Sequence, residues 1–258
     1  MERKTRYGGV VAVIVGALVL AVALGLQTGG PSGNAQARRL PGPKHSDSTN
    51  WSGYAVETNL ATPAANAVTD VKGSWVVPTI DSATYGYSSV WVGIDGYASS
   101  TVEQVGTEQD SSGRYYAWFE MYPRASRSIA QVHPGDAISA EVSYLGKNTY
   151  QLTITDRTRG HGFTYRTRQK VNAQRTSAEW VVEAPSSFGG VLPLADFGTA
   201  TISGAQATLL GHIGSISDSK WQADPMTMVT AGGVVKAEPS SLSAGGSSFS
   251  VAWKSAGP

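Results

Sequence analysis

Apolar and polar residues alternate along most of the chain from residue 50 onward. A period of two residues is the pattern of a β-strand, in which successive side chains point to opposite faces. It predicts strands over residues 89–96, 115–122, 137–144, 150–155, 163–168, 179–183, 226–230 and 248–253. Turn-forming runs such as 133–136 (HPGD) separate these segments, and no long segment beyond the N-terminus has a helical period. The pattern favours one all-β domain, built as a sandwich or a barrel.

Several predicted strands have an aliphatic face and an opposite face that mixes polar with aromatic residues. The opposite face of two of them carries Trp91, Asp95, Trp118, Glu120 and Tyr122. Such a surface is a candidate binding face. Tryptophan and tyrosine also cover exposed sheets that bind nothing, so the alternation alone leaves both interpretations open.

The N-terminus has the three-part layout of a bacterial-type secretory signal. Basic residues within positions 2–7 precede an apolar run at 8–26, and a small-x-small pattern ends at Ala37. We expect residues 1–37 to be cleaved and the protein to be secreted. A retained anchor is the alternative, because the apolar run is about as long as a membrane-spanning helix requires.

The remainder of the chain divides into a short connector and one domain. Residues 38–49 contain Pro41, Gly42 and Pro43 and have no apolar period, which indicates a linker or a short pro-segment. No second linker follows, so residues 50–258 are expected to form a single domain.

Composition excludes several classes of chemistry. The 258 residues include no cysteine, which rules out thiol catalysis, disulfides and zinc–thiolate sites. The formal charge is +1, and becomes −1 without residues 1–37, since 17 Lys and Arg then face 18 Asp and Glu. No basic aromatic stripe or phosphate-binding loop is present, so we expect no nucleic-acid partner, and no membrane contact once the signal is removed.

Serine and metal chemistry find little support. Of four histidines, only His212 is a plausible buried candidate for a serine triad, and no Gly-x-Ser-x-Gly motif accompanies it. No His-x-x-x-His spacing or acidic calcium loop occurs, so we expect no metal and no cofactor. Carboxylate and carboxamide groups remain. A carboxylate can activate water, and an amide can donate to an oxyanion. Two carboxylates could instead hydrolyse a glycoside.

Five short sequence motifs, in their order along the chain, resemble those of the glutamic peptidases, also called the G1 or eqolisin family. They are residues 50–54 (NWSGY), 91–96 (WVGIDG), 104–106 (QVG), 118–123 (WFEMYP) and 178–183 (AEWVVE). Together they span nearly all of the chain after the signal. The resemblance implies a sandwich of two antiparallel sheets of about seven strands each, similar in outline to the legume lectins.

The resemblance also implies a catalytic Gln–Glu dyad on the concave face of one sheet. The family's glutamine matches Gln104, in its Gln-x-Gly setting, rather than Gln109. Its glutamate matches Glu179, while Glu183 lies on the same strand face about 13 Å further along. Glu179 would take a proton from water and pass it to the leaving amine, and Gln104 would stabilise the oxyanion.

The same resemblance places five further residues near the cleft as supports and substrate contacts. They are Trp51, Trp91, Asp95, Trp118 and Glu120. The substrates implied are polypeptides, the activity is metal-independent and pepstatin-insensitive, and the optimum is acid. We expect a monomer.

The chain departs from the fungal members of this family in two respects: it has no cysteine, and it is richer in Lys and Arg. Fungal members commonly carry disulfides, and they tend to be poor in Lys and Arg. A chain with 17 basic residues would be strongly cationic near pH 3. We therefore expect a less acidic optimum or a lower acid tolerance. The competing functions are a lectin-like carbohydrate-binding module without catalysis, and a two-carboxylate glycosidase using Glu120 and Glu179.

Overall fold

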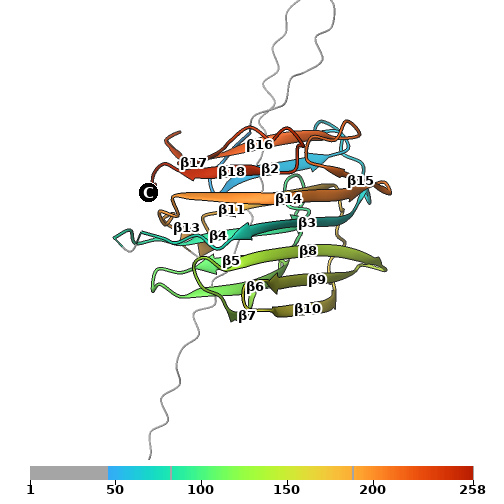
Figure 1. The fold of residues 1–258 in the computed structure, drawn as a ribbon. Coiled ribbons are helices and arrows are strands. Elements are labelled where there is room, and N and C mark those ends of the chain that lie inside the picture. The colour runs from blue at the N-terminus through green and yellow to red at the C-terminus, as the bar shows by residue number, and fades with distance from the viewer. Residues whose placement is uncertain (1–45, 82, 188, 258) are drawn as a thin grey trace, which may run out of the picture.

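The computed structural model describes residues 46–81, 83–187 and 189–257, and their regular structure consists of β-strands (Figure 1). In chain order the strands are β1 (Ser46–Ser48), β2 (Trp51–Glu57), β3 (Val68–Val76), β4 (Ser88–Ile94), β5 (Val102–Gln109), β6 (Tyr115–Tyr122), β7 (Arg127–Gln131), β8 (Ala137–Gly146), β9 (Thr149–Asp156), β10 (His161–Arg168), β11 (Ser177–Glu183), β12 (Ser186–Ser187), β13 (Gly190–Val191), β14 (Thr199–Leu209), β15 (His212–Ser215), β16 (Gln222–Val229), β17 (Val235–Pro239) and β18 (Phe249–Trp253). Each strand predicted from alternation overlaps one of them, and the predicted bounds of β6 agree with the structure at both ends.

The strands form two layers that a continuous hydrogen-bonded path joins (Figure 1). The path runs β10-β9-β8-β3-β14-β18-β17-β16-β2-β11-β4-β5-β6-β7, with β1 beside β16 and β15 beside β14. Near its ends the two layers are in contact, because Phe119 of β6, next to the terminal strand β7, packs against Tyr165 of the terminal strand β10 with ring centroids 4.6 Å apart. The predicted all-β sandwich is confirmed. The expected strand number per sheet is not, since the path turns from one layer into the other without a break.

The main core lies between the layers and is built from alternate residues of each strand. Val90, Val92 and Ile94 of β4 point into it, as the period-two pattern predicts. Two indoles tie the layers together: Trp180 of β11 donates to the Lys72 carbonyl at 2.8 Å. Trp75 donates to Thr107 Oγ1 at 2.9 Å. Buried indoles with satisfied N–H groups thus combine apolar burial with a fixed cross-layer contact.

The N-terminal predictions lie mostly outside the described residues. The expected signal at residues 1–37 is not described, and neither are residues 38–45 of the expected linker or pro-segment. The last part of that segment forms β1, parallel to β16, with Ser46 paired with Met226. Within the described ranges, the search for a helix long and apolar enough to cross a membrane found none.

Gly53 permits the closest approach of two strands in the layer that contains β2. Its φ is +151°, and a Cβ atom there would overlap the backbone carbonyl oxygen of Trp180. Gly53 pairs with Val181 of β11, so this contact lies in the middle of the β2–β11 ladder. A side chain at position 53 would push the two strands apart.

We expect Gly53→Ala to lower the free energy of unfolding by about 3 kcal/mol or more, because the obstacle is rigid backbone. Urea denaturation at constant pH measures it. Gly162→Ala in β10 is the matched control, since its Cβ would meet only Thr155 Oγ1 at 3.5 Å. The control should stay within about 0.5 kcal/mol of the parent. Equal midpoints for the two variants would contradict the role assigned to Gly53.

Candidate active site

Four adjacent strands align the two predicted dyad residues in one cross-strand row. Glu179 of β11 pairs with Gly93 of β4, Gly93 pairs with Gln104 of β5, and Gln104 pairs with Glu120 of β6. On the other side, Glu179 pairs with Ala55 of β2. Residues in register across adjacent strands share a face, so all these side chains point away from the core. We call this side of β2, β11, β4, β5 and β6 the site face.

Gly93 keeps the space between Gln104 and Glu179 free of a side chain. With adjacent strands about 4.8 Å apart, the Cα atoms of Gln104 and Glu179 are separated by about 9–10 Å. A Cβ at position 93 would lie 3.1 Å from the Gln104 Cβ and 3.0 Å from Cζ3 of Trp91. A side chain at position 93 would therefore crowd both Gln104 and Trp91.

Glu120 orients the Gln104 carboxamide. Gln104 Nε2 donates to Glu120 Oε2 at 2.7 Å, and both residues are buried. Burial raises the pKa of Glu120 well above its usual value, and the charge of Glu183 adds to the effect. The Gln104 bond and the Ser126 backbone amide oppose it. One N–H of the Gln104 amide is occupied by Glu120, which leaves the second N–H able to donate elsewhere.

Glu179 is completely buried, and burial is the largest cause that raises its pKa well above the usual value. The negative charges of Asp95 and Glu57 raise it further. The Ser177 hydroxyl and the Tyr97 backbone amide face the carboxyl and lower its pKa. Neither contact reaches good hydrogen-bond geometry, so among the described residues no donor occupies the two carboxyl oxygens. Glu179 is thus a carboxyl group available for proton transfer.

Asp95 acts on the chain just ahead of β11 instead of facing the gap. Its carboxylate accepts from the backbone amides of Arg175 at 2.6 Å and Thr176 at 2.9 Å. It also accepts from the hydroxyl of Thr101 at 3.2 Å. Asp95 therefore ties the start of β11, which carries Glu179, to the loop that precedes β5. A positive φ of 69° directs this residue out of the β4 ladder.

The three predicted tryptophans form an aromatic cluster on the site face. Trp51 and Trp91 pack edge to face with centroids 4.9 Å apart. Trp91 Nε1 donates to Glu183 Oε2 at 2.7 Å, and Trp118 Nε1 donates to Ser89 Oγ at 3.0 Å. The structure thus brings the predicted tryptophans together, with Trp91 and Trp118 in the next row along the strands from Gln104 and Glu179.

Comparison with known proteins decides the family. Residues 49–251 match the Peptidase A4 family. The chain belongs to this family. It is 28% identical over 218 residues to aspergillopepsin-2 of Aspergillus niger, covering 73% of this chain and 75% of the relative. The resemblance to the glutamic peptidases is confirmed.

Two solved structures show the same fold. One is scytalido-glutamic peptidase with a peptide-based transition-state analog, with a TM-score of 0.68 and 22% identity. That alignment covers 80% of this chain and 98% of the other. The second is aspergilloglutamic peptidase from Aspergillus niger, with a TM-score of 0.58 and 29% identity over 66% of this chain and 99% of the other.

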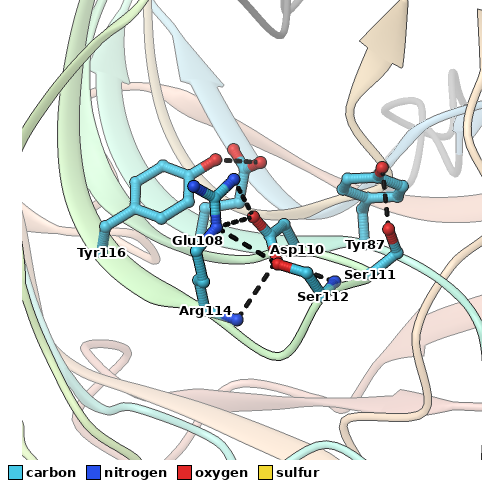
Figure 2. Close-up of polar contacts among 7 residues, drawn as sticks. All are labelled: Tyr87, Glu108, Asp110, Ser111, Ser112, Arg114 and Tyr116. Atoms are coloured by element: carbon cyan, nitrogen blue, oxygen red, sulfur yellow. Dashed lines mark hydrogen bonds and ion pairs between the residues drawn. The ribbon is translucent and has the colours of Figure 1, made fainter. Parts of the chain in front are cut away.

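This member of the A4 family carries a second carboxyl pair at the far end of the site face. Glu183 pairs with Ser89, and Ser89 pairs with Glu108 of β5. Figure 2 shows Tyr116 reaching Glu108, where its hydroxyl donates to Oε1 at 2.7 Å. Burial raises the pKa of Glu108 to about 7 and that of Glu183 to about 8. Glu183 is bound by Trp91 and also by the Asn50 amide at 3.1 Å, so it is less available than Glu179.

The turn that joins β5 to β6 holds this end of the site face together. Asp110 accepts from the backbone amides of Ser112 at 2.9 Å and Arg114 at 3.1 Å, and forms an ion pair with the Arg114 guanidinium at 2.6 Å (Figure 2). These bonds hold the pKa of Asp110 below its usual value, although burial acts against them. The closed turn fixes the register in which Gln104 meets Glu120.

Three residues on or beside the site face were not predicted. Glu108 follows Gln104 at an even spacing, so the strand period could have found it. Tyr97, in a loop, and Asp224, in β16, gave no such signal. The interpretation of His212 as buried is wrong, because it lies exposed in the β14–β15 hairpin and contacts Asp218 at 2.9 Å. Within the described ranges, no three His, Asp or Glu side chains gather where they could hold a metal ion.

The buried carboxyls make stability depend on pH. Each is neutral in the folded chain at pH values where it ionises in the unfolded chain, whose Glu pKa is near 4.3. The sign is therefore fixed: this contribution is fully present below about pH 4 and is lost as pH rises through 7 to 8, the range in which Glu108 and Glu183 titrate. These carboxyls therefore contribute more to stability in acid than above pH 8.

We expect the urea midpoint to fall as pH rises from 4 to 9. Glu108→Gln should remove on the order of 2 kcal/mol of that loss, since an amide cannot ionise. Glu238→Gln is the control, because Glu238 is half-exposed in an ion pair with Lys254. A Glu108→Gln slope equal to that of the control would show that Glu108 is not a source of the pH dependence.

Proposed function

We propose that this chain is a secreted endopeptidase that works in acid and hydrolyses peptide bonds with Glu179 and Gln104. The observation that carries the proposal is the row on the site face. Glu179 and Gln104 flank Gly93 and face the same way, and Glu120 fixes the Gln104 amide. Membership of the A4 family supports the peptidase class.

The chemistry follows from the two side chains. Ionised Glu179 removes a proton from a water molecule between it and Gln104, and the water oxygen bonds to the scissile carbonyl carbon. The carbonyl π electrons move to oxygen, and the free N–H of Gln104 donates to that oxyanion. The C–N bond then breaks, and protonated Glu179 returns its proton to the leaving amine. No metal takes part in these steps.

Glu120 contributes by position. Without it, the Gln104 amide could rotate and present its oxygen to the oxyanion, which would repel it. Glu120 is three strands from Glu179, about 14 Å by strand spacing. A retaining glycosidase needs its two carboxyls about 5 Å apart and an inverting one about 6.5–9.5 Å, so the spacing favours the peptidase over a glycosidase. The bond to Gln104 also commits Glu120 to another task.

The proposal includes secretion, polypeptide substrates and a monomeric state. The expected signal at residues 1–37 supports secretion, and the substrates are polypeptides. We keep the expectation of a monomer. The match to the peptidase family, not the side-chain types, favours catalysis over a carbohydrate-binding module.

The dyad is tested by casein hydrolysis between pH 2 and 7 in the presence of pepstatin. Glu179→Gln should lose at least about 1,000-fold in kcat, because an amide cannot take a proton. Gln104→Ala should lose about 100-fold through the missing oxyanion donor. Glu183→Gln should keep most activity. Full activity in Glu179→Gln, or loss only in Glu183→Gln, would move the base to another residue. Glycan binding without proteolysis would favour the lectin-like alternative.

The acid limb of the pH profile of kcat/KM reports the pKa of the general base, Glu179. Because burial raises the pKa of Glu179, we expect this limb to lie at higher pH than the 4.3 of an ordinary glutamic acid. This agrees with the less acidic optimum that the 17 basic residues suggest. Initial rates at fixed low substrate concentration, from pH 2 upward, measure the limb. A maximal rate at pH 2 with a stable protein would contradict it.

A further inference from the structure

The loop between β4 and β5, residues 95–101, folds back over the site face. Its Gly96 lies so close to Trp51 and Val102 that a Cβ there would come within 2.8 Å of the Trp51 ring and 2.6 Å of Val102. The Gly96 amide donates to Ser99 Oγ at 3.1 Å, which makes the loop compact. The loop is thus packed on the aromatic cluster of the site face and does not extend into solvent.

Tyr97 anchors this loop to a distant strand. Its hydroxyl donates to Asp224 Oδ2 of β16 at 2.6 Å and lies 3.2 Å from the Ser46 hydroxyl of β1. Asp224 is buried and pairs with Ala55, which in turn pairs with Glu179. The anchor therefore extends the row of the site face by two strands beyond Glu179.

The anchored loop lies against the proposed base. The Tyr97 backbone amide faces the Glu179 carboxyl, which has no exposed surface although it points away from the core. Tyr97 also lines a cavity of about 70 Å³, together with β1, Trp51 and Met226.

We propose that Tyr97, held by its hydroxyl on Asp224, is a positioning residue that keeps the loop 95–101 over Glu179, so that the base stays dry and correctly oriented. The inference rests on the proposed function, because it assigns a role relative to Glu179.

The effect on the base has a definite sign. The charges of Asp95 at the end of β4 and Glu57 of β2 raise the pKa of Glu179, and the Ser177 hydroxyl on β11 lowers it. Burial nevertheless raises the pKa of Glu179 more than any of these groups changes it. Loosening the loop admits water and lowers that pKa, so the acid limb of kcat/KM moves to lower pH. It also costs turnover, because the base is less well oriented.

Tyr97→Phe tests the proposal, since it removes only the hydroxyl. Tyr116→Phe is the matched control, because it removes a tyrosine–carboxyl hydrogen bond of 2.7 Å at the far end of the site face (Figure 2). Hydrogen exchange of the full chain, read on peptides that cover residues 95–101, should be faster in Tyr97→Phe alone. Its kcat should fall about tenfold, consistent with loss of a hydrogen bond to a charged group. Its acid limb should move to lower pH.

Substitution of the acceptor gives a rescue test. Asp224→Asn keeps an oxygen that can accept from Tyr97 and should retain slow loop exchange, whereas Asp224→Ala should behave like Tyr97→Phe. Unchanged exchange in Tyr97→Phe would overturn the proposal, and so would faster exchange with an unmoved acid limb. Proteolysis that persists in Glu179→Gln would instead refute the proposed function, while the exchange comparison would still decide whether Tyr97 anchors the loop.

Discussion

The register of β2, β11, β4, β5 and β6 is the constraint on which the site depends. A slip of one residue in any of these pairs would turn a site-face side chain into the core and expose an aliphatic one. Trp180, next to Glu179 in the chain, prevents this slip in β11, because its indole is buried between the layers and bonded to the Lys72 carbonyl. The core thus fixes Trp180, and strand alternation then places the neighbouring Glu179 on the opposite side of the sheet, the site face. The packing of Trp180 in the core therefore both stabilises the fold and places the Glu179 carboxyl.

The site face gathers buried carboxyl groups that would be costly as anions. Glu108, Glu120, Glu179 and Glu183 all lie under aromatic or loop cover, and burial is the largest cause that raises the pKa of each. Neutral carboxyls accept and donate hydrogen bonds without the desolvation penalty of a charge. Protonation of these carboxyls removes that penalty, so acid relieves the cost of burying them. Only Glu179 must lose its proton for the proposed chemistry, which sets a lower bound on the working pH.

Glycines stand at three positions on or beside the site face where a side chain would collide with neighbouring atoms. Gly53 brings β2 against β11, Gly93 keeps the gap between Gln104 and Glu179 open, and Gly96 lets the loop lie on Trp51. At Gly93 the demand is for room. At Gly53 and Gly96 a positive φ adds a backbone conformation that other residues rarely adopt.

By itself the sequence determined the all-β class, the alternate faces of β4 and β6, and, through five short motifs, the family. The period-two pattern and the motifs are local features of the sequence, so they can be recognised without knowing the fold. Only the tertiary structure decided which distant groups meet. Asp95 meets Arg175 and Thr176, Tyr97 meets Asp224 across 127 positions, and His212, expected to be buried, lies on an exposed hairpin. It also decided how far the pKa of each carboxyl is raised, because burial depends on loops and strands remote in sequence, and no local pattern encodes how much water they exclude.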